Sequence, residues 1–379
     1  MQPGTVTHAG TDSAGAPAAA GPLAPATPLQ AAVDDFALDA PEFTAAQWRR
    51  VRARANDAGP AVAELIDRAQ ASDGGKHMRP RLVAAAYLGL GGDDRTLLAE
   101  VAAAQQLIHL GLCMHDDIID GDRVRHGRPN LIGHYTEAGR ADGVGASTAE
   151  RQATAAALLA GDLALNTALV SLLGAPAPLE VRHALATEAG EALERTIVGE
   201  MLDVRSEVIP PHRAQPLRVA ELKTAAYSVA LPLRLGAIAS GRATAQQLAC
   251  LQHVGLAFGI AYQLADDDLG LFGSSAATGK SVLSDVQQGK RTEHIRIAYT
   301  RAGVADRAAL DAVLGDPGAS EADAAVVREI VLRTGAREEV SRTIDRHASL
   351  GIRLAAGALP DPLATYLADL ARHMRGRTS

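Results

Sequence analysis

Aromatic and sulfur-containing side chains are scarce in this sequence. Phe, Trp and Tyr together make up 3% of the 379 residues, and there are two cysteines, Cys113 and Cys250. Both cysteines lie in apolar stretches, at a spacing that fits neither a disulfide framework nor a zinc site. Runs with the alternation of a β-strand are also missing. The sequence therefore argues against a disulfide-stabilised or all-β fold, and we expect reduced cysteines in a cytoplasmic protein.

Excess positive charge and long uncharged apolar runs are absent as well. The formal net charge of −7 and the lack of a basic stripe argue against a nucleic-acid partner. No apolar run without a charge or a break reaches the length of about 18 residues that a membrane helix requires, so we expect no integral membrane segment. Residues 1–30 are rich in Ala, Pro and Gly, and Asp12 is their one charge. This segment differs from a secretory signal and is expected to be a disordered tail.

Alanine and leucine dominate the rest of the chain, and their spacing predicts helices. Hydrophobic residues are 47% of the sequence, enough for a large core. We predict a single all-α domain over residues 31–379, a helical bundle whose core positions carry the chemistry. The predicted helices cover residues 44–71, 79–90, 95–120, 148–173, 178–208, 218–240, 244–272, 290–302, 319–334 and 337–375. Residues 137–148 are small and polar, and are predicted to form a flexible loop.

Two clusters of aspartates close apolar helical stretches that are far apart in the chain. Asp116 and Asp120 are four residues apart and so share one face of a helix, and Asp266 and Asp267 end the second stretch. Adjacent carboxylates in an apolar stretch are costly unless a cation pairs with them. Mg²⁺ prefers carboxylate oxygens together with substrate phosphates. If the two clusters face each other, they predict a metal cage for a diphosphate.

Basic residues that adjoin glycines are distributed around these clusters. Glycine beside Lys or Arg lets backbone amides and a cation converge on one phosphate. Such tracts occupy residues 74–80, 123–129, 278–280 and 289–292, and Lys223 is followed by Thr224. Together with the two acidic clusters, they predict a site for diphosphate esters.

In their order and spacing, these motifs resemble those of the trans-isoprenyl diphosphate synthases, the polyprenyl synthetase family, over about residues 40–375. The matching motifs are Gly-Gly-Lys-x-x-Arg-Pro at 74–80, the first Asp-rich motif at 116–120, Arg125-x-Gly-x-Pro129, Gly161-Asp162, Gly199-Glu200-x-x-Asp203, Lys223-Thr224, Tyr262-Gln263-x-x-Asp266-Asp267, and Gly279-Lys280 with Asp285 and Gly289-Lys290. The resemblance implies the isoprenoid synthase fold, a helical bundle with a central active-site cavity, and a homodimer.

The family reaction joins isopentenyl diphosphate head to tail to an allylic diphosphate. The resemblance implies three Mg²⁺ ions, two on Asp116 and Asp120 and a third on Asp266, with Asp267 acting through water. It also implies that the departing diphosphate is bound by cationic side chains: Arg125, Lys223, Lys280 and Lys290.

The resemblance also assigns residues to the two organic groups. The Lys223 carbonyl, the Thr224 hydroxyl and the Gln263 side-chain oxygen would stabilise the allylic cation in a dry cavity. Isopentenyl diphosphate would be bound by residues of the glycine-rich tract and the first acidic helix: Gly75, Lys76, Arg79 and His109.

The chain departs from the family pattern at several positions. His126 stands where the family usually has a second arginine that contacts isopentenyl diphosphate, and His77 replaces a frequent arginine. The second acidic motif ends in Gly270, where many members have an aspartate, and Asp268 adds a carboxylate one helical step away. These replacements predict a weaker isopentenyl diphosphate site and a second acidic motif that relies on Asp266 and Asp267.

The residues before the first acidic motif bear on product length. Members that make farnesyl diphosphate commonly have an aromatic residue four or five positions before the first aspartate, where this chain has Leu112 and Gly111, with Ile108 one turn deeper. These side chains predict an open channel and geranylgeranyl diphosphate as product. Two alternatives remain: a terpene cyclase on the same scaffold, favoured by His126, and a partner subunit of a heteromeric synthase.

Overall fold

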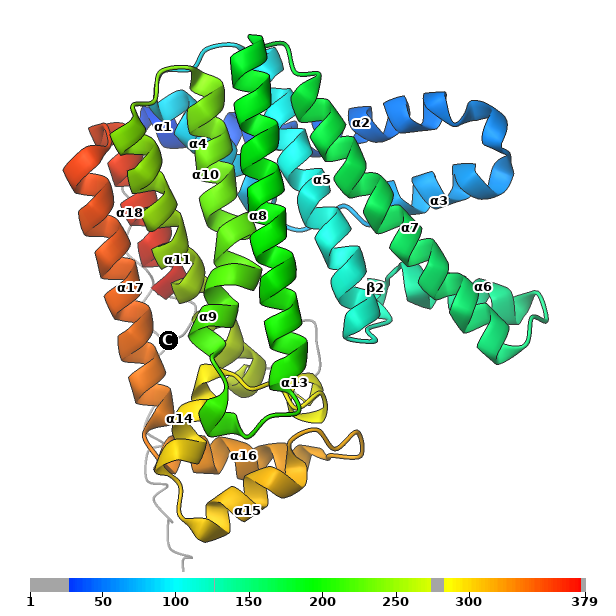
Figure 1. Ribbon diagram of the computed structural model, residues 1–379, viewed down its shortest axis with the longest axis vertical. Coiled ribbons are helices and arrows are strands. Elements are labelled where there is room, and N and C mark those ends of the chain that lie inside the picture. Colours follow the sequence, from blue (N-terminus) through cyan, green and yellow to red (C-terminus); the bar gives the residue numbers. More distant parts are fainter. Residues whose placement is uncertain (1–26, 126, 274–282, 376–379) are drawn as a thin grey trace, which may run out of the picture.

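The computed structural model describes residues 27–125, 127–273 and 283–375, and this part of the chain is almost entirely helical (Figure 1). Two short strands, β1 (Val124–Arg125) and β2 (Arg128–Pro129), pair antiparallel beside the first acidic motif. The predicted all-α bundle is confirmed. Its helices are α1 (Pro28–Leu38), α2 (Ala40–Arg54), α3 (Pro60–Ala71), α4 (Met78–Gly89), α5 (Arg95–Ile119), α6 (Leu131–Ala141), α7 (Ala146–Leu173), α8 (Leu179–Ser206), α9 (Pro216–Val219), α10 (Leu231–Ser240), α11 (Ala245–Phe272), α13 (Ser284–Gln287), α14 (Glu293–Arg301), α15 (Val304–Val313), α16 (Glu321–Arg333), α17 (Ala336–Ala358) and α18 (Asp361–Arg375).

Helices α5 and α7 form a closely packed pair that carries the first acidic motif at its lower end (Figure 1). Small residues make the close packing possible. A Cβ added to Gly111 of α5 would lie 2.9 Å from the Gly161 carbonyl oxygen and 2.8 Å from Leu165 Cγ of α7. A row of alanines on α7 is fully or almost fully buried: Ala153, Ala157, Ala160, Ala164 and Ala168. The alanine-rich composition is therefore used to bring helix axes together.

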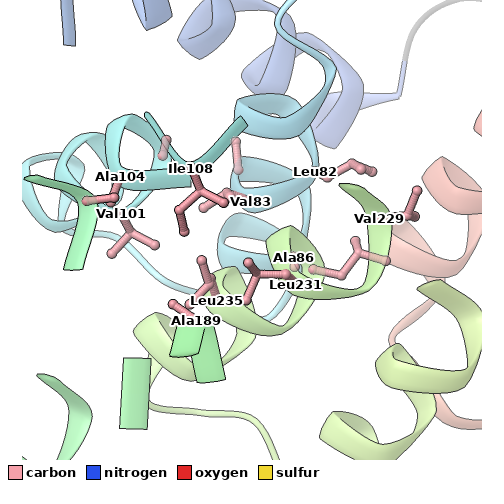
Figure 2. Close-up of a cluster of buried hydrophobic side chains, with 14 of the residues drawn as sticks. Leu82, Val83, Ala86, Val101, Ala104, Ile108, Ala189, Val229, Leu231 and Leu235 are labelled. Atoms are coloured by element: carbon pink, nitrogen blue, oxygen red, sulfur yellow. The ribbon is translucent and has the colours of Figure 1, made fainter. Parts of the chain in front are cut away.

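The larger of two hydrophobic cores lies among the upper halves of the helices. Figure 2 shows its centre, where Ile108 of α5, Val83 of α4 and Leu231 of α10 point toward one another. A second, smaller core joins the lower part of α11 to α14, α16 and α17, and includes Ala225 and Leu264. Since Ala225 and Leu264 adjoin Thr224 and Gln263 in the chain, this second core helps to fix the residues that line the site.

A π-helix, η3 (Ala220–Ala230), carries Lys223 and Thr224 between α8 and α11. π-Helical segments are rare and occur frequently at functional sites. Pro232 follows two residues later and has no N–H to continue regular α-helical bonding, which favours a change of hydrogen-bond register here. Glycine permits the close packing, because a Cβ at Gly199 of α8 would lie 2.2 Å from the Lys223 nitrogen. The chain thus brings α8 directly against the Lys223 backbone.

Several predicted boundaries were wrong. The predicted helix 44–71 is two helices, since the chain turns at Gly59, with φ +91°, and Pro60 starts α3. The predicted helix 337–375 is also two, because Pro360 cannot continue α17. Residues 137–148 are mostly helical, with α6 ending at Ala141 and α7 starting at Ala146. Residues 28–30 were expected to belong to a disordered tail but form the start of α1, which Thr27 caps, and residues 1–26 lie outside the described part.

Three helices are long and apolar enough to cross a membrane, by length and composition alone: α5, α7 and α11. The expectation that no stretch reaches this length was therefore wrong. Within the bundle, the apolar windows of α5 and α11 are 72% and 61% buried, while that of α7 is 44% buried. The apolar character of α5 and α11 is accounted for by packing in the core, whereas α7 exposes part of its apolar surface.

Candidate active site

Lys223 lies at the centre of a group of carboxylates that come from two helices, α5 and α8. Its Nζ is 2.9 Å from Glu200 Oε2 and 2.9 Å from Asp203 Oδ2, both on α8, and 3.2 Å from Asp116 Oδ1 on α5. The close contact at Gly199, one residue before Glu200, places the α8 carboxylates within reach of this ammonium. Sequence reasoning quoted Glu200 and Asp203 within a motif but gave them no role. Their spacing of three on one helix face was the available signal.

The charges of this group stabilise one another. Burial alone would lower the pKa of Lys223, but Asp116, Asp203 and Glu200 more than offset it, so its pKa is raised and it stays charged. Burial would raise the pKa of Asp116, but Lys223, Lys290 and Arg125 outweigh this effect and lower it. The site therefore contains an ionised carboxylate beside a fixed ammonium, in surroundings largely shielded from solvent.

The rest of the first acidic motif is also paired with cations. Arg125 donates to Asp117 at 2.6 and 2.9 Å and to Asp116 at 3.1 Å, and Asp117 is buried. Asp117 therefore orients Arg125. Lys290, which follows α13, donates to Asp120 at 2.9 Å. The predicted first cluster is thus brought together with Arg125, Lys223 and Lys290.

The second acidic motif lies on α11 and connects to the π-helix through hydrogen bonds. Thr224 donates to Gln263 Oε1 at 2.7 Å, and Gln263 Nε2 donates to Asp267 at 2.7 Å. Burial, and then the charges of Asp285, Asp266 and Asp203, raise the pKa of Asp267 to about 8, although the bond from Gln263 opposes this. The charge of Asp203 on α8 therefore reaches the second acidic motif.

Asp268 does not belong to the acidic group, contrary to the expectation that it supplies an extra carboxylate there. It is buried, accepts two hydrogen bonds of 2.9 Å from Arg337 of α17, and lies 3.2 Å from His294 Nε2 of α14. Arg337 in turn covers the Phe272 ring, 4.1 Å from its centroid. Consecutive helical residues point about 100° apart, so Asp268, two residues after Asp266, points to nearly the opposite side of α11. Its contacts with Arg337 and His294 connect α11 to α17 and α14.

A second group of polar residues gathers around Tyr227 of η3. Arg79 donates to Ser228 at 2.7 Å and lies over the Tyr227 ring, 5.3 Å from its centroid. The His109 ring also stacks on the Tyr227 ring, with their centroids 6.2 Å apart. The Arg79 Nε is buried and has no hydrogen-bond partner, so this guanidinium retains donor capacity. The sequence predicted that Arg79 and His109 serve one substrate, and the structure places both side chains against Tyr227, a residue that the sequence did not single out.

The remaining predicted residues are placed as follows. Gly75 and Lys76 are exposed on the loop that precedes α4. His126 and Lys280 lie outside the described residues. Gly270 packs against a carboxylate, since a Cβ there would lie 2.7 Å from Asp285 Oδ2.

The carboxylates supply a donor set that suits a hard divalent cation. Within the described ranges, no three His, Cys, Asp or Glu side chains are close enough together to hold a metal ion. Instead, Lys223 and Lys290 lie directly on Asp116 and Asp120. Carboxylate oxygens that are clustered and already face cations are the type of ligand that Mg²⁺ prefers. A metal ion would compete with the two ammonium groups for the same oxygens.

The structure also revises the argument on product length. Gly111 was expected to widen the channel, but the space beside its Cα is filled by Leu165 and the Gly161 carbonyl. Ile108 is fully buried in the larger core (Figure 2). Only Leu112, which is half-buried, remains of the positions expected to open the channel. The absence of an aromatic side chain at position 111 is therefore no evidence for an open channel.

Comparison with known proteins agrees with this geometry. The family model described as polyprenyl synthetase matches residues 62–331. The (2E,6E)-farnesyl diphosphate synthase of Mycobacterium bovis is 31% identical over 308 residues, which cover 80% of each chain. The geranylgeranyl diphosphate synthase of Mycobacterium tuberculosis is 31% identical over 295 residues, covering 77% of this chain and 76% of the relative.

A solved structure shows the same arrangement of helices. The geranylgeranyl pyrophosphate synthase of Corynebacterium glutamicum, complexed with isoprenyl diphosphate and magnesium, superposes with a TM-score of 0.84. It is 29% identical in sequence, and the match covers 91% of this chain and 99% of that chain. With the matched motifs, the shared fold and the paired acidic groups, the chain belongs to the polyprenyl synthetase family.

Proposed function

We propose that this protein is a magnesium-dependent prenyltransferase that condenses isopentenyl diphosphate with an allylic diphosphate to give a longer trans-prenyl diphosphate. The observation that carries the proposal is the presence of two groups of cationic and polar side chains, one around Lys223 and one around Tyr227 of the π-helix. One is the charged group around Lys223, Arg125 and Lys290, and the other is the Arg79–His109–Tyr227 group. Two substrates that each carry a diphosphate require two such groups.

Asp116, Asp120 and Asp266 are the side chains that would hold magnesium, three ions by family analogy. Bound there, the metal would neutralise negative charge on the departing diphosphate. Both statements rest on the family resemblance and on the oxygen donor set described above.

The chain's own residues would assist loss of diphosphate through fixed charge. Arg125 is held by Asp117, and Lys223 by Glu200 and Asp203, so neither cation has to reorganise when the C–O bond breaks. The developing allylic cation would lie near the Thr224 hydroxyl and the Gln263 carbonyl oxygen, which are hydrogen-bonded to each other. The two fixed dipoles stabilise positive charge without offering a nucleophile as reactive as water.

The second substrate would be bound by the group around Tyr227. Arg79 and His109 both contact Tyr227, and Lys76 lies on the loop before α4. A diphosphate held there would place the double bond of isopentenyl diphosphate toward the cation and convert an encounter in solution into a reaction within one complex. The proton lost after bond formation would pass to the departed diphosphate, which remains in the charged group.

The function is tested by incubating the purified protein with Mg²⁺, isopentenyl diphosphate and dimethylallyl, geranyl or farnesyl diphosphate, with products identified by mass. We expect geranylgeranyl diphosphate as the main product. Release of product at farnesyl diphosphate would contradict the product length but support the reaction. A cyclic hydrocarbon formed without isopentenyl diphosphate would support the cyclase alternative, and activity only with an added partner would support the subunit alternative.

A homodimer is part of the proposal, and the exposed faces of α7 and α8 support it. Large apolar side chains are exposed along both helices: Leu158, Leu159, Val170, Leu173, Leu179, Ile197, Val198, Met201 and Leu202. Extended apolar surface of this kind marks an interaction site in a soluble protein. We propose that α7 and α8 pack against the same helices of a second copy, which would cover the exposed part of α7.

Replacing Ile197 by glutamate should convert the dimer to a monomer, because a charge would be buried in the apolar contact without a partner. Light scattering coupled to size-exclusion chromatography measures the mass directly. The control is Val326→Glu, on α16 and also exposed, which should leave the dimer unchanged. A monomeric wild-type protein at the concentrations of the assay would refute the homodimer.

A further inference from the structure

Asp73 connects the glycine-rich loop before α4 to the helix that carries the first acidic motif. Its Oδ1 accepts a hydrogen bond of 2.8 Å from Gln106 Nε2 of α5, and lies 3.3 Å from His77 Nε2. Asp73 and His77 have only 11% and 13% of their side-chain surface exposed. The carboxylate therefore bridges two polar groups in a largely shielded position, at the start of the loop that presents Lys76 and Arg79.

Asp73 provides the side-chain hydrogen bonds of this loop. Gly74 and Gly75 have no side chains, and Lys76 is exposed. In the described part of the chain, two side-chain hydrogen bonds are found for residues 73–77, and Asp73 is the acceptor in both. A loop of two glycines is otherwise free to sample many conformations. Its position relative to α5 consequently depends on the Asp73–Gln106 contact.

The backbone at His77 is held in a disfavoured conformation. His77 has φ +47° and ψ +44°, in the left-handed region, and it is the one non-glycine residue with positive φ in the described ranges. This conformation is disfavoured for a residue with a Cβ, and persists when surrounding contacts determine it. The contact with Asp73 is such a determinant. It sets the direction in which the chain enters α4, two residues before Arg79.

Gln106 lies on α5 among residues that define the neighbouring group. Gln106 is buried, the adjacent Gln105 donates to the Tyr227 carbonyl oxygen at 3.0 Å, and His109 follows one turn later. Gln106 therefore ties the loop to the same stretch of helix that contacts Tyr227. Since Asp73 is paired with Gln106 and His77, it is not itself a ligand for an anion.

We propose that Asp73, through Gln106 and His77, is a positioning residue that sets the affinity for isopentenyl diphosphate and not the rate of the chemical step. The proposal rests on the proposed function. By fixing the loop against α5, Asp73 places Lys76 and Arg79 at a defined distance from His109, and so pre-organises a site for one diphosphate. In the proposed function the allylic diphosphate is bound by other cations, those around Lys223, so its affinity should not depend on Asp73.

The test is a swap of donor and acceptor at the Asp73–Gln106 contact. Asp73→Asn and Gln106→Glu should each raise the KM for isopentenyl diphosphate about tenfold, equivalent to about 1.4 kcal/mol. The first removes the charged acceptor, and the second places two carboxylates against each other. The double variant Asp73→Asn/Gln106→Glu restores a donor–acceptor pair in reverse order, and its KM should return to within about threefold of wild type.

The split between substrates separates positioning from a general structural role. The kcat and the KM for the allylic diphosphate should stay within about twofold of wild type in both single variants and in the double variant. Asp67→Asn is the matched control, since Asp67 is an exposed residue of α3 paired with Arg52. It should change neither KM.

Several results would overturn the proposal: an unchanged KM for isopentenyl diphosphate in Asp73→Asn, an equal rise in both KM values, or a double variant no better than the singles. Because Gln106 is buried, Gln106→Glu could fail to fold, and Asp73→Asn then decides alone. A wild-type protein that does not consume isopentenyl diphosphate would refute the proposed function instead, so the two failures are distinguishable.

Discussion

Replacing Asp116 by asparagine should lower kcat/KM by about 1000-fold or more, because a metal-holding carboxylate supplies several kcal/mol of transition-state stabilisation. Asp116 is the residue at which the charged groups of the site meet, since its two oxygens contact Lys223 and Arg125. Asparagine keeps the size of the side chain but removes the charge. Lys223 would retain Glu200 and Asp203, so the fold should survive.

Steady-state kinetics with varied Mg²⁺ concentration measures this effect, and thermal unfolding verifies that the variant is folded. Asp369→Asn on α18 is a suitable control, because Asp369 is a partly exposed carboxylate that pairs with Arg372 far along the chain. Its kinetics should match those of the wild type. Activity of Asp116→Asn within tenfold of wild type would contradict the assignment of Asp116 to the metal site.

Replacing Gly199 by alanine should destabilise the protein by about 2–3 kcal/mol, the usual upper range for overpacking of a core. The added Cβ would lie 2.2 Å from the Lys223 nitrogen and 2.7 Å from the Leu222 carbonyl carbon. Backbone atoms cannot rotate away, so α8 and the π-helix must separate. Since this moves Lys223 relative to Asp116, activity should fall about 100-fold as well.

Chemical denaturation and kcat together measure the Gly199→Ala effect. Gly357→Ala on α17 is the control, because Gly357 is exposed and its Cβ would meet no atom within 4 Å. Alanine there should leave activity unchanged and leave stability unchanged or raised by up to about 1 kcal/mol. If Gly199→Ala were as stable and active as Gly357→Ala, the close packing of α8 on the π-helix would not determine the site.

Much of the fold could be predicted from the sequence, because helical periodicity and breaking residues are local signals. Helices α4, α5, α8 and α11 begin and end within two residues of the predicted positions. The failures came from single residues that interrupt an otherwise continuous pattern. Gly59 and Pro60 divide one predicted helix, and Pro360 divides another.

The candidate site was predictable in part for the same reason. The spacing of four between Asp116 and Asp120 places them on one helix face, and the structure pairs them with Lys223 and Lys290. Three adjacent aspartates at 266–268 looked alike in the sequence, yet Asp268 pairs with Arg337 on a distant helix. No local pattern predicts that partner, since it depends on how α17 crosses α11.

By itself, the sequence determined that the protein is all-α and which residue types are available for diphosphate chemistry. Both follow from local properties: the period of the apolar residues and the composition of short motifs. The tertiary structure decided which charges meet. Gly199 lets α8 approach Lys223, and Gly111 serves the packing of α5 on α7 instead of widening a channel. Contacts between distant helices depend on how closely their backbones approach, and this is fixed only when all helices pack together.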